Sequence, residues 1–560
     1  MPSAPRKNAR SSSAAKPVVL TPQALSIQNV VDVARRGAKV SISKASMSAM
    51  LRSRRVVERC LTDGQAHYGI NTGFGSLAKQ RVGLDDLKTL QRNLVRSHSA
   101  GVGEPLREEL VRAMMLILAA SLARGLSGVR PVVVETLVKM INAGVVPVVP
   151  SIGSVGASGD LAPLAHVALC LIGEGQATIS KPANLRAAGF SPRGSASTAT
   201  ARPMPAAKAL EKAGIKPLEL HAKEGLALIN GTHLMCAEGA LLSEDALRLC
   251  QIAELTLAMS IDGCRASHSY LDERLYLARR NAWCDGTARV IRAALAGGKI
   301  AESHLENDPR VQDPYSLRAG VTVQGAASAQ IFRFRHTIES ELGAVSDNPL
   351  VFAKGVRLPL GTDRRPYLHD ISNLTREDAV ISGANFHGMP LAIPLDCLAI
   401  VLCHIAGISE RRSYLMTGAF EPESHLKPFL TPRPGLQSGL MIAQYTAAAC
   451  VNEMIGLATP ASVSNITTCA GMEDYNSWGP RAAAKARRSL ELATKVVAIE
   501  MLCAAAALDV HAPLKSGKAV EAAKRIIRTK VKPQGEDRVL TNDIEAIATL
   551  ISTGAFDNVV

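Results

Sequence analysis

Long stretches in which alanine and leucine recur at helical spacing dominate this sequence. Strand-type alternation is scarce and aromatic residues make up only 3% of the chain, so we do not expect an all-β sandwich or barrel. The helical stretches are Leu234–Ile261, Thr322–Leu342, Leu395–Arg412, Ser438–Leu457 and Arg481–Leu508. Because helices of this length pack side by side, we predict a mainly α protein built around a long-helix bundle.

The segments around these helices divide the chain into four parts. Residues 1–20 carry basic but no acidic side chains, and we expect a disordered leader there. Residues 21–205 hold the glycine- and proline-rich stretches and form the predicted N-terminal unit. Residues 206–512 form the helix-bundle unit. Residues 513–560 form a basic helical tail, whose segment 515–532 we expect to be solvated surface.

Composition argues against several classes of partner. The net charge is +15, but the basic excess lies partly at the two ends and no aromatic platform accompanies it, so nucleic acid is not expected as the main partner. No uncharged apolar run approaches the roughly 20 residues that cross a bilayer, so no membrane span is expected. The N-terminus lacks the apolar segment of a secretory signal, and the 11 cysteines include no CxxC pair. We therefore expect reduced thiols and a cytoplasmic protein.

Common catalytic motifs are absent from the sequence. It contains no GxxxxGK[ST] nucleotide loop, no GxGxxG between a strand and a helix, no HExxH and no GxSxG. Histidines such as His387 and His404 are isolated in sequence, and such histidines more often form hydrogen bonds than bind a metal. We expect no metal ion.

The segment 153–166, GSVGASGDLAPLAH, is the least ordinary in the chain because it sets glycines at spacing three around Ser158, directly before a helix. One interpretation is a flexible loop with Asp160 as the N-cap of that helix. Glycine also permits a backbone so tight that the amide nitrogen of Gly159 could reach the carbonyl carbon of Ala157. If that ring closed and Ser158 lost its hydroxyl as water, the chain would carry a conjugated methylene, an electrophile that no ordinary side chain provides.

Six blocks of sequence occur together in this chain. They are YGINTGFG (68–75), LQRNLVRSHSAGVGEPL (90–106), GSVGASGDLAPLAH (153–166), EGLALINGTH (224–233), QDPYSLR (312–318) and SDNPLVF (346–352), with GANFHG, SERR and the MED of GMEDYNS in support. With these blocks the chain resembles the aromatic amino acid ammonia-lyases, and among them most of all the histidine enzymes. That family uses a 4-methylidene-imidazol-5-one (MIO) group formed from an internal Ala-Ser-Gly. The similarity covers roughly Leu20 to Leu508 and implies the family's fold.

The resemblance implies a set of catalytic groups. Ala157, Ser158 and Gly159 would form the MIO ring, which the substrate amine attacks so that ammonia becomes a bound leaving group. Tyr68 matches the base that removes a weakly acidic β-proton, and a phenol of reference pKa about 10 can do so only if the site stabilises phenolate. Tyr315 would lie near the ring and the amine. No dissociable cofactor is implied.

The resemblance also implies how an amino acid substrate is held. Arg318 matches the arginine that grips the substrate carboxylate, and Asn230 would bond the ring's oxygen or that carboxylate. The pair Ser97 and His98, with Glu473, resembles the groups that the histidine enzymes direct at the imidazole, because a carboxylate would be unpaired beside a phenyl ring. Any of these polar side chains could instead satisfy backbone groups of the fold. The full implied set is Ser97, His98, Asn230, Gln312, Arg318, Phe386 and Glu473.

The chain departs from the family pattern around the substrate. Gly471 and Met472 stand before Glu473 where the family commonly has Asn-Gln, residues 319–324 read AGVTVQ in place of a polar turn with Gln and Pro, and His233 replaces a Gln. These changes remove polar groups near the ring and the amine end of the site. They leave the fold and ring formation expected but the substrate open.

Three functional hypotheses follow from the sequence. The leading one is elimination of ammonia from L-histidine to give trans-urocanate. The second is an MIO lyase or 2,3-aminomutase that acts on tyrosine, phenylalanine or a modified histidine such as a betaine. The third is a helical scaffold or basic binding protein without activity, which would have no need for an intact Ala157–Gly159, Tyr68, Tyr315 and Arg318.

We also expect a homotetramer. The long helices present more apolar surface than one chain readily covers, so they should pack into a shared bundle with closed symmetry. The resemblance implies the same assembly, with active sites that draw residues from more than one subunit. It implies that Tyr68, Tyr315 and Asn230 around one ring come from different chains.

Overall fold

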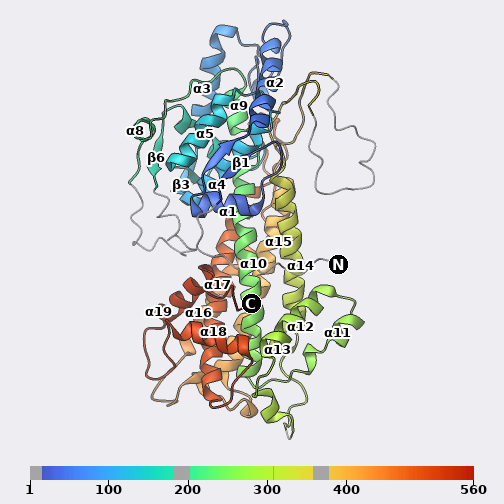
Figure 1. Cartoon of the computed structure of the whole chain (residues 1–560), viewed down its shortest axis with the longest axis vertical. Coiled ribbons are helices and arrows are strands. Elements are labelled where there is room, and N and C mark those ends of the chain that lie inside the picture. Colours follow the sequence, from blue (N-terminus) through green and yellow to red (C-terminus); the bar gives the residue numbers. More distant parts are fainter. Residues whose placement is uncertain (1–15, 181–201, 307, 357–376, 560) are drawn as a thin grey trace.

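Long helices form the centre of the structure, and each coincides with a stretch predicted from the sequence. The computed structural model describes residues 16–180, 202–306, 308–356 and 377–559. The central helices are α10 (His233–Gly263), α14 (Gly320–Glu341), α15 (Met389–Gly418), α16 (Met441–Leu457) and α17 (Gly479–Val510). Helix α17 packs along α10, α15 and α16, and Figure 1 shows α10, α14, α15 and α17 running along the long axis. The predicted mainly α fold with a long-helix bundle is confirmed.

Helix α15 begins at Met389 rather than at Leu395 as the sequence predicted. Pro390 lies in its first turn, where a missing N–H has no helical partner to lose, whereas Pro394 lies inside the helix and removes one N–H from its hydrogen bonds without ending it. By length and composition α15 is the one described helix that could cross a membrane, but 56% of its most apolar window is buried inside the protein. It packs against α14, α16 and α17, which makes it a core helix of the bundle.

The first part of the chain forms shorter helices, which lie above the bundle in Figure 1. Every residue of α4 from Leu110 to Ala123 is buried, as expected for a helix that is apolar on all sides. These helices are α1 (Ile27–Arg36), α2 (Lys44–Cys60), α3 (Leu87–His98), α4 (Glu108–Ala123), α5 (Pro131–Ala143), α6 (Leu161–Leu171), α8 (Ala206–Lys212) and α9 (Glu224–Ile229).

The described strands are short and pair into small sheets. Strand β1 (Val18–Leu20) pairs parallel with β2 (Val40–Ile42), so these three residues of the predicted leader are ordered sheet, whereas residues 1–15 lie outside the described residues. The other pairings are antiparallel. They join β3 (Val102–Pro105) to β5 (Pro150–Ile152), β4 (Val145–Pro147) to β6 (Gln176–Ile179), β6 to β7 (Met204–Pro205) and β8 (Leu350–Phe352) to β9 (Ala379–Ile381).

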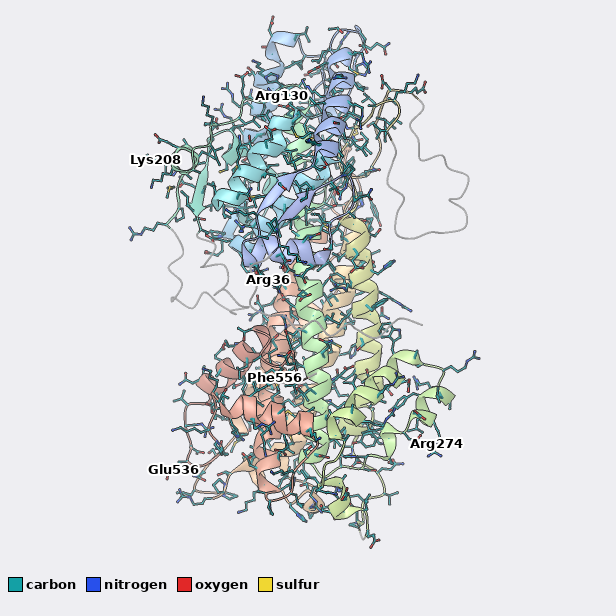
Figure 2. All side chains as sticks on the ribbon, in the orientation of Figure 1. Arg36, Arg130, Lys208, Arg274, Glu536 and Phe556 are labelled. Carbon is teal, nitrogen blue, oxygen red and sulfur yellow. The ribbon has the colours of Figure 1, made fainter. Side chains whose placement is uncertain are left out.

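The last part of the chain is helical, but it is more than a solvated tail. Helix α18 (Lys518–Arg528) buries Val520, Ala523 and Ile527 while its basic residues stay on the other face. Phe556 is fully buried, and Figure 2 shows it beside the bundle while Glu536 and Arg274 point outward. The helices that flank the bundle are α11 (Glu273–Ala278), α12 (Ala282–Leu295), α13 (Tyr315–Arg318), α18 and α19 (Leu540–Ser552). The predicted unit boundaries at 205 and 512 stay predictions.

A buried network of ion pairs ties the N-terminal helices to the bundle. Asp245 of α10 accepts two hydrogen bonds from Arg35 of α1, at 2.6 and 2.7 Å, and one from Arg487 of α17 at 2.8 Å. Arg35 also donates to Glu109 of α4 at 2.7 Å. Burial alone would raise the pKa of Asp245, but Arg35 and Arg487 outweigh it and hold that pKa well below its usual value. Asp245 is therefore ionised in the folded protein at every physiological pH.

Replacing Asp245 should destabilise the protein strongly. In Asp245→Asn the two buried guanidinium groups lose their shared carboxylate, and we expect the free energy of unfolding to fall by about 3 to 5 kcal/mol in urea titrations followed by circular dichroism. The matched control is Asp285→Asn, which breaks a surface pair with the exposed Arg289 and should cost no more than about 1 kcal/mol. Equal losses in the two variants would contradict the assigned role of the network.

Candidate active site

The serine of the GSVGASGD segment stands in a turn between β5 and α6 that is held by a backbone contact with another part of the chain. Gly159 has a positive φ of +71° and pairs with Gly231 in an isolated parallel bridge. A Cβ at Gly159 would lie 2.1 Å from the carbonyl oxygen of Gly231, so no larger residue fits. The turn is thus fixed by the chain just before α10 rather than free.

Asp160 also holds the turn against the segment that begins at Gly231. Its backbone N–H donates to the carbonyl of Gly231 at 2.7 Å, and its carboxylate accepts the N–H groups of Leu234 and Met235 at 2.9 and 3.1 Å. The sequence suggested Asp160 as the side-chain N-cap of the following helix, but it makes no such bond to α6 and binds the first turn of α10 instead. Burial raises the pKa of Asp160 to about 7, against the opposing effect of those N–H groups.

A cavity of about 660 Å³ opens beside this turn. It is lined by Ala157 and Ser158, by the loop after α2, by α3 and α9, and by two later segments around 382–387 and 469–475. The sequence-predicted residues that line it are Tyr68, His98, Ala157, Ser158, Asn230, Phe386 and Glu473. One chain therefore brings most of the predicted site together.

Glu473 contacts the serine of the turn directly. The Ser158 hydroxyl donates to Glu473 Oε1 at 2.8 Å, and Thr468 Oγ1 donates to Glu473 Oε2 at 2.9 Å. Thr468 and Glu473 also pair through their backbones across the 3-10 turn Cys469–Gly471. This carboxylate thus faces both Ser158 and the cavity, whereas the sequence assigned it to the substrate ring alone.

Tyr68 lies half-buried where the Gly-rich loop meets the cavity. Its hydroxyl accepts a hydrogen bond from the Gly75 N–H at 3.3 Å. Burial raises the pKa of Tyr68, the Gly75 bond lowers it, and the neighbouring Cys469 and Glu473 raise it further. The surroundings provided by one chain therefore favour the neutral phenol, and the phenolate that the sequence argument required is not stabilised by them.

His98 and Asn230 offer polar atoms to the cavity. His98 Nδ1 donates to the Leu94 carbonyl at 2.9 Å, and burial lowers the pKa of His98, so the ring is neutral at pH 7 with its other nitrogen free to accept. Asn230 donates to the Asn348 carbonyl at 3.1 Å, while its buried Oδ1 has no partner. Ser97 does not line the cavity, because its hydroxyl donates back to the Leu94 carbonyl of its own helix at 3.1 Å.

Gln312, Tyr315 and Arg318 are not brought to this cavity. They lie in and before α13, which contacts α10, α14 and α15 at the end of the bundle opposite to α3 and α9 in Figure 1. Tyr315 is 72% exposed, and the Arg318 guanidinium carbon lies 4.6 Å from the Tyr315 ring centre. Gln312 and Arg318 instead line a separate cavity of about 380 Å³. Tyr68 and Asn230, by contrast, line one cavity of one chain, so the expectation that they come from different chains is wrong.

Sequence reasoning missed the support behind Asn230. The Nζ of Lys223 donates to Asp347 Oδ2 at 2.7 Å, and both side chains are almost wholly buried. The other carboxylate oxygen of Asp347 accepts from Asn348 N at 2.6 Å and from Asn230 Nδ2 at 3.4 Å. Lys223 and Asp347 are 124 positions apart in the sequence. Lys223 directly precedes one of the six sequence blocks and Asp347 lies within another, which was the only sequence signal of a shared site.

The chain is similar to known proteins over nearly its whole length. Residues 25–529 match the aromatic amino acid lyase family. The histidine ammonia-lyase of Anaeromyxobacter sp. (strain K) is 43% identical over 541 residues, which cover 96% of this chain and 99% of that protein. The crystal structure of histidine ammonia-lyase from Trypanosoma cruzi superposes with a TM-score of 0.83 at 34% identity, covering 97% of this chain and 94% of that one. Tyrosine aminomutase from Streptomyces globisporus gives a TM-score of 0.83 at 33% identity, covering 97% and 98%.

The chain belongs to the aromatic amino acid lyase family. It is a carbon–nitrogen lyase that acts on an amino acid, and its family uses the MIO electrophile.

The buried carboxyl of Asp160 should leave a signature in the pH dependence of stability. Its folded pKa of about 7 lies above the unfolded value of about 4, so the stability that this group contributes is present below pH 4 and is lost as the pH rises to 7. Asp160→Asn cannot titrate. We therefore expect its free energy of unfolding to rise relative to that of the native sequence by roughly 4 kcal/mol between pH 4 and pH 7.

Urea titrations at a series of pH values measure this difference. From about one pH unit above its folded pKa the difference should become constant, because Asp160 is then ionised in both states. Asp285→Asn, which breaks only the pair with Arg289 at the surface, serves as the control for loss of a carboxylate. A constant difference between Asp160→Asn and the native sequence over the whole range would mean that Asp160 keeps an ordinary pKa.

Proposed function

We propose that this protein is a histidine ammonia-lyase, which removes ammonia from L-histidine to give trans-urocanate. The observation that carries the proposal is the cavity in which Ser158, Tyr68, His98 and Glu473 of one chain meet. The similarity to a histidine ammonia-lyase over nearly the full length of both chains supports it.

We propose that Ala157, Ser158 and Gly159 form the MIO ring. The residues present fit this group, because Ala157 is buried, Gly159 adopts a conformation that only glycine readily takes, and the Ser158 hydroxyl is held by Glu473. Closure joins the Gly159 nitrogen to the Ala157 carbonyl carbon with loss of one water, and Ser158 loses its hydroxyl and α-hydrogen as a second. When formed, the group supplies an electrophile for the substrate amine.

The cavity residues then have distinct proposed tasks. Tyr68 accepts the β-proton, and since burial raises its pKa, the reaction requires the small phenolate fraction or a further positive charge near its hydroxyl. The unpartnered Oδ1 of Asn230 accepts a hydrogen bond from the substrate amine. Phe386 contributes an apolar wall.

Polar groups in the cavity favour an imidazole over a phenyl ring. The neutral His98 has a free acceptor nitrogen and Glu473 carries a carboxylate, so both can pair with the N–H groups of histidine. Beside phenylalanine the same groups would be buried without partners, which costs binding energy. The tyrosine and phenylalanine lyases or aminomutases, and a betaine of histidine, remain the alternatives that a substrate panel distinguishes.

We predict that histidine gives the highest kcat/KM in a panel with tyrosine, phenylalanine and trimethylated histidine, followed by the ultraviolet absorbance of each conjugated product. His98→Leu should lower kcat/KM for histidine at least tenfold relative to phenylalanine, because it removes the acceptor and leaves an apolar surface. Ser99→Ala, at the end of the same helix, is the matched control and should leave the ratio unchanged. A different preferred substrate, or a ratio unmoved by His98→Leu, would refute the histidine assignment.

We propose that the working enzyme is a homotetramer in which a second chain supplies Gln312, Tyr315 and Arg318 to the cavity. Among the described residues that line the cavity of one chain, there is no arginine to bind the substrate carboxylate. Helices α15 and α16 carry exposed apolar residues that a neighbouring chain could cover, namely Ile393, Ile400, Ile442, Tyr445 and Ile455. We further propose a cytoplasmic location, which suits the free thiols of all 11 cysteines.

Mixing two inactive variants tests shared sites. Tyr68→Phe and Arg318→Ala should each lose activity, and hybrids formed after gentle dissociation and reassembly should recover part of it, because some cavities then hold an intact tyrosine and an intact arginine. Light scattering measures the assembly, and differently tagged chains prove subunit exchange. A monomer, or exchanged hybrids without any rescue, would count against the composite site.

A further inference from the structure

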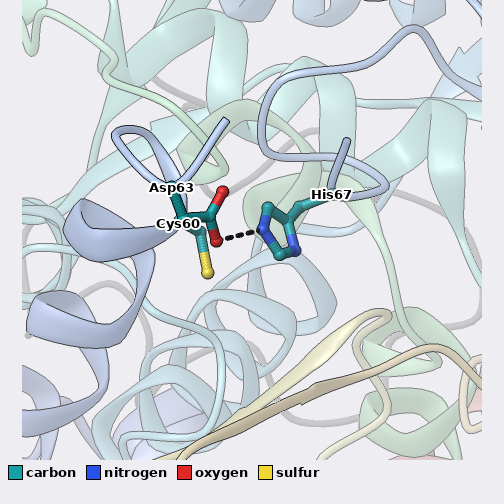
Figure 3. Close-up of side chains that lie close together, drawn as sticks. All are labelled: Cys60, Asp63 and His67. Atoms are coloured by element: carbon teal, nitrogen blue, oxygen red, sulfur yellow. Dashed lines mark hydrogen bonds and ion pairs between the residues drawn. The ribbon is translucent and has the colours of Figure 1, made fainter. Parts of the chain in front are cut away.

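Three side chains with metal-binding atoms lie together just outside the cavity. Cys60 ends α2, and Asp63 and His67 follow in the loop, as Figure 3 shows. The Cys60 sulfur, an Asp63 carboxylate oxygen and a His67 ring nitrogen all lie within 4.8 Å of one another. Asp63 Oδ2 and His67 Nε2 are 2.7 Å apart. We propose that these three residues bind a zinc ion.

The donor set has the chemistry that zinc prefers. Thiolate, imidazole and carboxylate are its usual protein ligands, and three of them leave a fourth position for water. Two anionic ligands and a neutral imidazole also balance the charge of a divalent cation. A thiolate and an imidazole together select against magnesium and calcium, which prefer oxygen ligands. The sequence prediction of no metal overlooked this cluster, because the spacing C-x2-D-x3-H matches no common motif.

The surroundings leave room for a cation. Cys60 is 7% exposed and packs on Val57 and Ile70, while Asp63 is exposed and gives an entry path from solvent. The nearest basic side chain in sequence, Arg59, is paired with Asp378. Apolar packing accounts for a cysteine at this position, and an Asp–His pair is stable alone, but neither requires the thiol to lie beside the pair.

The proposed site sits directly before Tyr68. The backbone N–H of His67 donates to Asn71 Oδ1 at 2.7 Å, and the His67 carbonyl accepts from Ile70 N at 3.1 Å, so His67 belongs to the turn that carries Tyr68. A metal ion bound to Cys60 and His67 would tie this turn to the end of α2. Zinc should therefore reduce the mobility of the segment that presents the proposed base.

Cobalt, which replaces zinc and absorbs light, tests the site on the full-length protein. We expect one Co²⁺ per chain, with a near-ultraviolet thiolate-to-cobalt band that zinc abolishes and magnesium does not. Cys60→Ser should lose the band, and Asp63→Asn and His67→Ala should weaken binding at least tenfold. Cys397→Ser and His336→Ala, at exposed positions elsewhere, are the matched controls and should bind like the native protein.

A second measurement keeps the test independent of how the Cys60 variant folds. Amide hydrogen exchange over residues 61–71 should slow several-fold in zinc for the native protein and the two controls, but not for Asp63→Asn, at an exposed position, or His67→Ala, at a partly buried one. A cobalt band that survives Cys60→Ser, affinity that is unchanged in His67→Ala, or the absence of any stoichiometric binding would overturn the proposal. None of these readouts depends on turnover, so they stand apart from the proposed lyase activity.

Discussion

The close approach of Gly159 to Gly231 determines where the turn that carries Ser158 stands. The two backbones are so near that a methyl group on Gly159 would fall 2.1 Å from the Gly231 carbonyl oxygen. Asp160 reinforces the contact by binding the first turn of α10, the 31-residue helix that runs through the whole bundle. The position of Ser158 therefore depends on the packing of the core rather than on the loop that contains it, which is how a glycine-rich segment can be rigid.

Sequence periodicity predicted the long helices well, because helices such as α10 and α17 bury apolar residues along nearly their whole length. The predicted residues that line the cavity were found through local blocks. What the sequence could not provide is the pairing between blocks: Ser158 and Glu473 are 315 positions apart, and Lys223 meets Asp347 across 124. Asp160 shows the same limit, since its place before α6 predicts a local cap while its carboxylate binds α10. The spacing of residues along the sequence does not predict contacts between residues that are far apart in it.

The predicted substrate-binding groups lie at two separate places in the chain, and this separation affects both binding and catalysis. The cavity contains the acidic and neutral polar groups, whereas Arg318 and Tyr315 stand at the other end of the bundle with Tyr315 largely exposed. A lone chain would bind the substrate carboxylate poorly, and Tyr68 would keep a raised pKa. Assembly that brings a guanidinium to the cavity would correct both, because a nearby positive charge favours carboxylate and phenolate alike. Oligomerisation and catalysis are coupled in this account.

The central claim is that the turn held between Gly231 and α10 converts Ala157, Ser158 and Gly159 into an electrophile without a partner protein. Intact-mass measurement of the purified chain tests it most directly. The account predicts a mass lower than that of the unmodified sequence by two water molecules, and an unmodified mass for Ser158→Ala together with loss of activity. A native chain of unmodified mass that is fully active as a lyase would contradict it.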